Sequence, residues 1–194
     1  MIRRLSAAAA RRAGKGVQAL GSLAKLASCR LRFPEISFGS SVYIAPSATL
    51  RATDGGSIAI GDRVKVMPGA VIVARGGRIS IGADSHVGYG AIITAIDQVT
   101  IGKFTLIAEY VTVRDQNHGT RLSSEAFARQ PLRTAPVHIG DNVWLAAKAT
   151  VLKGVRIGNS TIVGAGAVVV KDVPSRSLAI GVPARSHERG MDAS

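Results

Sequence analysis

The sequence predicts an all-β protein: a parallel β-helix of about six coils, with one long extruded loop and a short basic N-terminal segment that is helical. Aliphatic or aromatic residues recur every six positions through most of the chain, a spacing that a helix, with its period of 3.6, does not produce. Glycine is abundant at 22 residues, and aromatic residues make up only 4% of the chain. This composition indicates many turns and a core built from Val, Ile, Leu and Ala.

The repeat consists of six triplets of apolar positions, and glycine follows the first position of every triplet. The triplets lie at 38, 44, 50; 60, 66, 72; 81, 87, 93; 101, 107, 113; 139, 145, 151; and 157, 163, 169. Small or β-branched residues mostly stand four positions after each of them. We expect each six-residue unit to be a short strand and a corner, with both kinds of residue pointing inward. Three units then form one coil, and strands of successive coils pair in parallel about 4.8 Å apart.

Departures from the repeat locate the irregular parts of the domain. Small excess lengths predict bulged corners at DGGS 54–57 and RGGR 75–78. A much larger excess between Val113 and Ile139 predicts a polar loop over 114–138, and loops of such length inside a compact domain usually carry function. The predicted organisation is a basic segment over 1–35, a β-helix domain over 36–185 and a tail over 186–194.

The N-terminal segment differs in charge from the rest of the chain, whose formal net charge is +13. Residues 1–32 contain eight basic residues and no acidic residue. Three interpretations stay open: a basic amphipathic helix on an anionic membrane face, a solvated extension that packs on the main domain, and an organellar transit peptide. The chain has one cysteine, Cys29, which gives no sign of an oxidising compartment. The predicted location is the cytoplasm, including the inner face of the membrane.

Several motifs near the C-terminus resemble those of a known family. Residues 140–185 contain Trp144, VLKGV at 151–155, GAGAVVVKDVP at 164–174 and GVPAR at 181–185. They resemble the hexapeptide-repeat acyltransferases, in the branch of galactoside and maltose O-acetyltransferases and polysaccharide-biosynthesis acetyltransferases, and the resemblance covers 36–185. It implies a left-handed β-helix, a homotrimer, acetyl-CoA as acyl donor without a metal, and a sugar or lipid-linked glycan as acceptor.

The predicted chemistry depends on a histidine at the start of the long loop. The resemblance implies that His118 is the general base. An imidazole titrates near neutral pH, so it can take the proton of an attacking hydroxyl and return it to the departing thiolate. We expect direct transfer in a ternary complex, with a backbone N–H stabilising the oxyanion. Asp115 and Asn117 are candidates to orient the imidazole or to bind the acceptor, although such residues often make only local hydrogen bonds in turns.

The resemblance also implies a coenzyme site, formed by Ala147, Ala165, Val170, Lys171 and Arg185. Ala147 and Ala165 would meet the pantetheine arm through their backbone, and Val170 would flank the nucleotide end. Lys171 and Arg185 are suited to coenzyme phosphates, or they belong to a generally basic surface. Trp144 is either a platform beside the coenzyme or, as we favour, a packing anchor at a trimer seam.

The acceptor site departs from the family pattern. An asparagine that contacts the acceptor in the sugar acetyltransferase branch corresponds to Gly88 here. Tyr89 and Asp97 are available substitutes, so a simple galactoside or maltose is not the expected acceptor. Transfer to a hydroxyl is expected over transfer to an amine, and the length of the acyl chain stays open.

Two other classes share the predicted fold. A zinc enzyme of the trimeric carbonic anhydrase type requires histidines five residues apart, whereas Val113 and Ser123 stand at those distances from His118. A non-catalytic scaffold is disfavoured by the loop histidine and by the coenzyme motifs. Nucleic-acid binding is suggested by charge alone and is not predicted.

Overall fold

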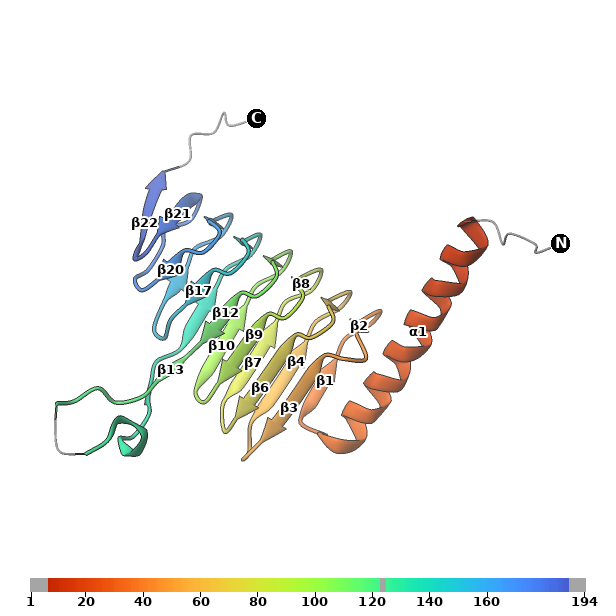
Figure 1. Cartoon of the computed structure of the whole chain (residues 1–194), viewed down its shortest axis with the longest axis horizontal. Coiled ribbons are helices and arrows are strands. Elements are labelled where there is room, and N and C mark those ends of the chain that lie inside the picture. Colours follow the sequence, from red (N-terminus) through yellow and green to blue (C-terminus); the bar gives the residue numbers. More distant parts are fainter. Residues whose placement is uncertain (1–6, 123–124, 189–194) are drawn as a thin grey trace.

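One long helix followed by a stack of short parallel strands forms the molecule (Figure 1). The computed structural model describes residues 7–122 and 125–188, and side chains of the helix from residue 19 onward. Helix α1 spans Ala7–Arg32 without a break, although glycines at 14, 16 and 21 each lower its intrinsic helix propensity by about 1 kcal/mol. The predicted fold class, a parallel β-helix of about six coils with an N-terminal helix, is confirmed.

Three sheets make the three faces of the stack. The A sheet contains β1 (Ile36–Phe38), β4 (Ser57–Ile60), β7 (Arg78–Ile81), β10 (Gln98–Ile101), β15 (Val137–Ile139) and β18 (Arg156–Ile157). The B sheet contains β2 (Tyr43–Ile44), β5 (Lys65–Val66), β8 (His86–Val87), β11 (Leu106–Ile107), β16 (Trp144–Leu145), β19 (Ile162–Val163), β21 (Ser177–Gly181) and β22 (Ala184–Glu188). The C sheet contains β3 (Thr49–Thr53), β6 (Val71–Arg75), β9 (Ile92–Ala95), β12 (Thr112–Arg114), β17 (Thr150–Val151) and β20 (Val168–Val169).

The strand register confirms every predicted triplet. On the A sheet the first members of the triplets lie side by side, in the order Phe38, Ile60, Ile81, Ile101, Ile139 and Ile157. The second and third members form equivalent columns on the B and C sheets. Apart from Phe38, which is half-buried, these side chains are buried. The core is therefore three columns of stacked aliphatic side chains.

The glycine after the first position of each triplet has a steric explanation. A Cβ atom at Gly82 would lie 2.5 Å from the carbonyl carbon of Gly102 in the next coil. Gly61, Gly102 and their equivalents face the following coil equally closely. The chain must turn inward here while keeping the strand spacing, so any side chain would push neighbouring coils apart.

The stack ends differently from the predicted boundaries. After the sixth coil, β21 pairs in parallel with β19, and β22 folds back antiparallel to β21. The strand structure therefore continues to Glu188, beyond the predicted limit at 185. The remainder of the predicted tail, residues 189–194, lies outside the described residues, as do residues 1–6 of the basic segment.

The C-terminal half of α1 packs against the first coil. The backbone N–H of Ile44 in the edge strand β2 donates to Ser22 Oγ at 2.9 Å, and both residues are buried. A Cβ atom at Gly21 would lie 2.8 Å from Pro46 Cγ, so the absence of a side chain at 21 permits this close approach. Cys29 is buried on the same side of the helix. These contacts agree with the interpretation of the segment as an extension packed on the main domain.

No described helix is both long enough and apolar enough to cross a membrane.

Replacing Ser22 tests whether the helix stabilises the first coil. Ser22→Ala leaves the buried N–H of Ile44 without its acceptor, which is expected to lower the free energy of unfolding by about 1–3 kcal/mol. The measurement is urea unfolding followed by circular dichroism. Ser37→Ala, at an exposed position of β1, is the matched control and should change the midpoint little. Equal midpoints for the two variants would contradict the assigned role of Ser22.

Candidate functional site

The long insertion leaves the stack after β12 and returns before β15, as predicted (Figure 1). Its two limbs form a short antiparallel ribbon, β13 (Gln116–Asn117) with β14 (Arg133–Thr134), and a 3-10 helix, η1 (Phe127–Arg129), lies in its outer part. His118 follows β13 directly and is exposed to solvent. The histidine therefore stands at the base of the loop, where the ribbon joins the stack.

A buried carboxylate fixes this branch point. Asp115 is fully buried, and its carboxylate accepts hydrogen bonds from the backbone N–H of Ile96, at 3.0 and 3.1 Å, and from that of Asp97, at 2.7 Å. Its carbonyl oxygen accepts from the N–H of Ala135 on the returning limb. Asp115 thus joins the outgoing limb, the corner of the preceding coil and the returning limb. These hydrogen bonds join segments that are distant in the sequence and are not local turn contacts, and the carboxylate is too buried to touch an acceptor.

A second buried polar side chain organises the outer loop, and sequence reasoning missed it. Gln130 Oε1 accepts from the N–H of Arg121, while Nε2 donates to the carbonyl oxygens of Arg121 and Glu125. A Cβ atom at Gly119, next to His118, would lie 2.9 Å from Gln130 Cβ. Gln130 therefore sets the path of the chain immediately after the histidine. A single glutamine in a polar loop gave no sequence signal for this role.

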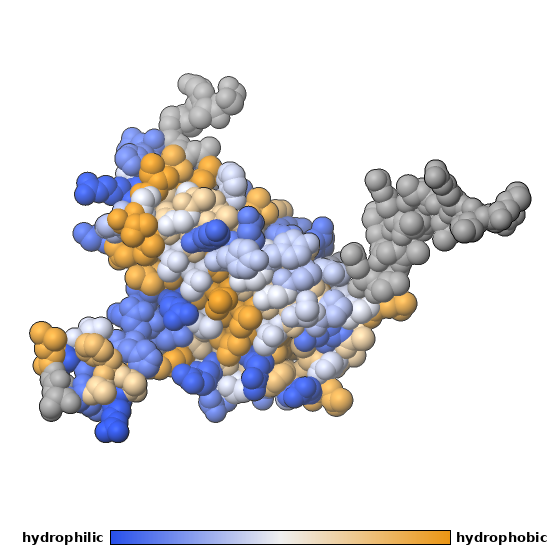
Figure 2. All heavy atoms as spheres, viewed as in Figure 1, coloured by the Kyte–Doolittle hydropathy of each residue, from blue (hydrophilic) through white to orange (hydrophobic). Residues whose placement is uncertain are grey.

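His118 faces a hollow of about 390 Å³ between the loop and the C sheet. The lining combines polar and apolar groups and includes two arginines from the C sheet: Arg75, Ile96, Arg114, Gln116, Asn117, His118, Thr120 and Leu132. Gln116 Nε2 donates to Thr94 Oγ1 at 3.0 Å, which ties β13 to the sheet. Figure 2 shows hydrophilic residues where the loop leaves the stack. The hollow is large enough for a small ligand and offers several hydrogen-bond donors beside the imidazole.

The predicted acceptor residues do not all meet at this hollow. Asn117 lines it next to His118, and Asp97 lies at the corner that Asp115 holds. Tyr89 lies at the opposite edge of the C sheet, between β8 and β9, where it is 53% exposed. There it lines a separate hollow of about 340 Å³ with Tyr43, Lys65, Met67 and Pro68. Within one chain, Tyr89 and His118 therefore belong to different sites.

The predicted coenzyme residues fall into two groups. Ala147 and Ala165 lie in successive coils at the corner between the B and C sheets, where the N–H of Gly166 donates to the carbonyl oxygen of Ala147 at 2.9 Å. Arg185 reaches the same corner on β22, opposite Ile180. Val170 and Lys171 follow β20 at the other edge of the C sheet, the edge from which the loop leaves. One chain thus presents the two groups at opposite edges of one sheet.

Trp144 lies on the outer face of the B sheet, away from both edges of the C sheet. It is 47% exposed and pairs in register with Leu106, itself 51% exposed, and with Ile162. This face therefore presents a strip of apolar side chains to solvent.

The remaining histidines are separate from the loop. His86 is half-buried on β8 between Lys65 and Leu106. Burial, followed by the positive charge of Lys65, lowers the pKa of His86 below its ordinary value. His138 lies on β15, and His187 is exposed on β22. In the part of the chain that the structure describes, no three His, Cys, Asp or Glu side chains are grouped to hold a metal ion.

Comparisons with known proteins agree with this architecture. Residues 136–171 match the family described as "Bacterial transferase hexapeptide (six repeats)". The putative lipopolysaccharide biosynthesis O-acetyl transferase WbbJ of Escherichia coli K12 is 40% identical over 48% of this chain and 51% of its own length. The galactoside O-acetyltransferase of the same organism is 33% identical over 65% of this chain and 61% of its own length. The chain therefore spans only about half to three-fifths of these relatives.

Two solved structures extend the comparison to the whole fold. The polysialic acid O-acetyltransferase OatWY superposes with a TM-score of 0.69 at 25% identity, over 82% of this chain and 79% of its own. AntD, an N-acyltransferase from Bacillus cereus in complex with dTDP and 3-hydroxybutyryl-CoA, superposes with a TM-score of 0.67 at 19% identity. That likeness covers 82% of this chain and 86% of AntD, and it concerns the fold alone.

The role of Asp115 can be tested by removing its carboxylate. Asp115→Ala leaves the N–H groups of Ile96 and Asp97 without acceptors in a buried corner, which is expected to lower the free energy of unfolding by about 3 kcal/mol. Chemical denaturation measures this, with Asp97→Ala as the control that removes a neighbouring, half-exposed carboxylate. Unchanged stability of Asp115→Ala would contradict the assigned role of its carboxylate.

The lowered pKa of His86 predicts a pH dependence of stability. Because the folded pKa lies below the unfolded value of about 6.5, the unfolded chain binds the proton first as the pH falls. Stability is therefore expected to decline below about pH 6.5. His86→Gln should make this decline shallower, as measured by thermal unfolding between pH 7.5 and pH 5, whereas His187→Gln should not. Identical slopes for all three proteins would refute the assignment.

Proposed function

Because residues 136–171 match the bacterial transferase hexapeptide family, we propose that the chain is an acetyl-CoA-dependent acetyltransferase with a sugar or glycan hydroxyl as acceptor and His118 as general base. The observation that carries this proposal is the position of His118. It stands on a loop fixed by a buried carboxylate, at the wall of a hollow between the loop and the stack that Arg75, Arg114 and Gln116 also line. A histidine placed by chance on a surface loop would not need such an anchor.

In the proposed mechanism the imidazole of His118 acts twice. It first takes the proton of the acceptor hydroxyl as the oxygen attacks the thioester carbonyl, and then gives that proton to the departing coenzyme A thiolate. An imidazole suits both steps, because its neutral form accepts the hydroxyl proton and the resulting imidazolium donates that proton to the thiolate. Arg75 and Arg114 line the same hollow and provide donors for acceptor oxygens. No covalent enzyme intermediate is required.

A homotrimer is part of this proposal. Ala147 and Ala165 lie at one edge of the C sheet, and the loop with His118 leaves from the other edge. A groove between two neighbouring prisms would bring unlike edges of two chains together, with the coenzyme arm along one wall and the histidine on the other. The exposed strip around Trp144 and Leu106 supports packing between copies, since apolar surface of this kind favours association.

The acceptor class is supported by the relatives, which are named for lipopolysaccharide biosynthesis, galactoside and polysialic acid acetylation. The cytoplasm is the location that goes with acetyl-CoA as donor. Exposed Leu20, Leu23 and Leu31 on a helix that lacks acidic residues support peripheral contact with an anionic membrane, where a lipid-linked acceptor would be found.

Removing the imidazole tests the central assignment. His118→Ala is expected to lower kcat by about 10²–10⁴-fold, measured as thiol release from acetyl-CoA across a panel of sugar and lipid-linked glycan acceptors. His187→Ala, which replaces an exposed histidine on β22, is the matched control and should retain full turnover. Full activity of the His118 variant, with the oligomer intact by light scattering, would refute the assignment.

A further inference from the structure

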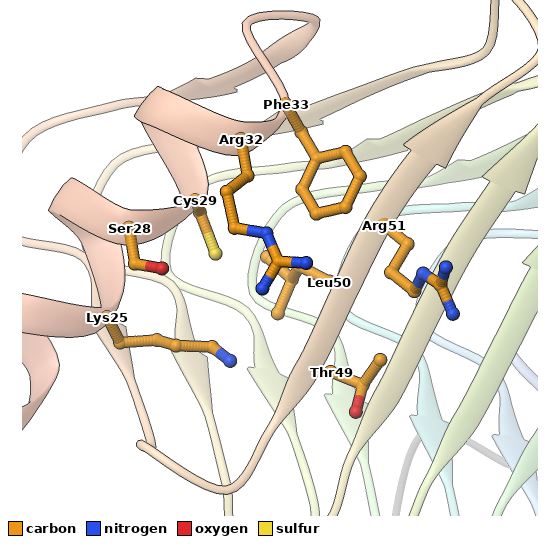
Figure 3. Close-up of a pocket in the computed structure, with 8 residues that line it drawn as sticks. All are labelled: Lys25, Ser28, Cys29, Arg32, Phe33, Thr49, Leu50 and Arg51. Carbon is orange, nitrogen blue, oxygen red and sulfur yellow. The ribbon is translucent and has the colours of Figure 1, made fainter.

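A second hollow lies at the junction of the helix and the first coil, and the proposed reaction makes no use of it. Its volume is about 300 Å³. The helix contributes Lys25, Ser28, Cys29 and Arg32, the following turn contributes Phe33, and strand β3 contributes Thr49, Leu50 and Arg51 (Figure 3). The hollow exists because the helix docks on the stack, so its two walls come from segments that are distant in sequence.

The charged residues that line this hollow are all positive. Lys25 and Arg32 extend from the helix toward β3, which carries Arg51 (Figure 3). None of these three side chains forms an ion pair with a carboxylate among the described residues, whose one such pair is Arg63 with Asp84 on the A–B corner. Three like charges around one cavity repel one another, and a bound anion would relieve that repulsion.

The other lining groups suit a compact anion that accepts many hydrogen bonds. Ser28 and Thr49 provide hydroxyl donors, and the planar guanidinium groups of Arg32 and Arg51 match the oxygens of a phosphate. Cys29 forms part of the buried wall. Burial raises the pKa of the Cys29 thiol, and the positive charges of Lys25 and Arg32 oppose that rise, so both cations lie close to the wall of the cavity.

This hollow is separate from the one beside His118. Strand register places Arg51, Val73, Thr94 and Arg114 in one row across the C sheet. Arg51 lines the hollow at the helix, and Arg114 lines the hollow at the loop. Three strand spacings of about 4.8 Å, about 14 Å in all, separate these two arginines, whereas Arg75, at the near end of the loop hollow, is on β6 directly beside β3. The predicted coenzyme residues, in turn, lie beyond the loop in the last coils.

We propose that the hollow between α1 and β3 is a binding site for a phosphate group, supplied either by a free phosphate or diphosphate compound or by the headgroup of an acidic phospholipid. Lys25, Arg32 and Arg51 provide the charge, and Ser28 and Thr49 provide additional donors. The site does not depend on the acetyltransferase activity, so the two can be tested independently.

The test compares two double variants of the full chain. Arg32→Gln with Arg51→Gln removes two charges at the hollow, and both residues are exposed, so folding should be preserved. Arg78→Gln with Arg176→Gln removes two exposed charges elsewhere and is the matched control. Binding of inorganic pyrophosphate is measured by calorimetry at about 0.15 M salt, where surface charges are screened. Sedimentation with phosphatidylglycerol or phosphatidylcholine vesicles forms the second arm.

If the hollow binds phosphate, Arg32→Gln with Arg51→Gln should weaken binding at least tenfold, and the control pair should leave binding unchanged. Loss confined to pyrophosphate identifies a free phosphate compound, and loss confined to phosphatidylglycerol vesicles identifies a lipid headgroup. Cys29, the single cysteine of the chain, reports occupancy, because the bound probe should slow its reaction with a thiol reagent. Absence of binding in both arms, or equal loss in both variants, would overturn the proposal.

Discussion

The whole structure depends on one constraint: each inward aliphatic side chain must stack on its counterpart in the next coil while the strands stay in parallel register. A coil of six-residue units has too little interior to be stable alone, so neighbouring coils supply both its hydrogen bonds and its apolar contacts. The close approach of Gly82 to Gly102, which leaves no room for a Cβ atom, shows how little space remains between coils. The same constraint explains the scarcity of aromatic residues, which would not fit between rungs about 4.8 Å apart.

A parallel stack leaves two open ends, and each is closed differently. At the first coil, Ser22 of α1 accepts a hydrogen bond from the edge strand at Ile44, which satisfies a group that would otherwise be available to another chain. At the last coil, β22 folds back on β21 with reversed direction. Strand β22 occupies the edge of β21 that a further parallel coil would need for its hydrogen bonds, so the stack ends there.

The repeat made most of the fold predictable. Each coil repeats the same spacing of apolar residues, so one atypical residue does not change the predicted strand register. The columns at Ile81 and Ile101 and the site of the loop followed directly from spacing. Side chains with a role at a single place, outside the repeat, could not be identified from the spacing. The burial of Asp115 depends on Ile96 in the preceding coil, and the role of Gln130 depends on how the loop folds over it. Neither partner is marked by any periodicity.

Docking of α1 on the first coil couples the stability of the stack to the proposed binding of an anion between α1 and β3. Any anion that binds between Arg32 and Arg51 contacts the helix and β3 together, so it binds only where α1 is docked. By linkage, such a ligand must stabilise docking by the same free energy with which docking favours the ligand. Repulsion among Lys25, Arg32 and Arg51 opposes docking, and an anion bound between them would reduce that repulsion. A structural end cap can in this way respond to the phosphate content of its surroundings.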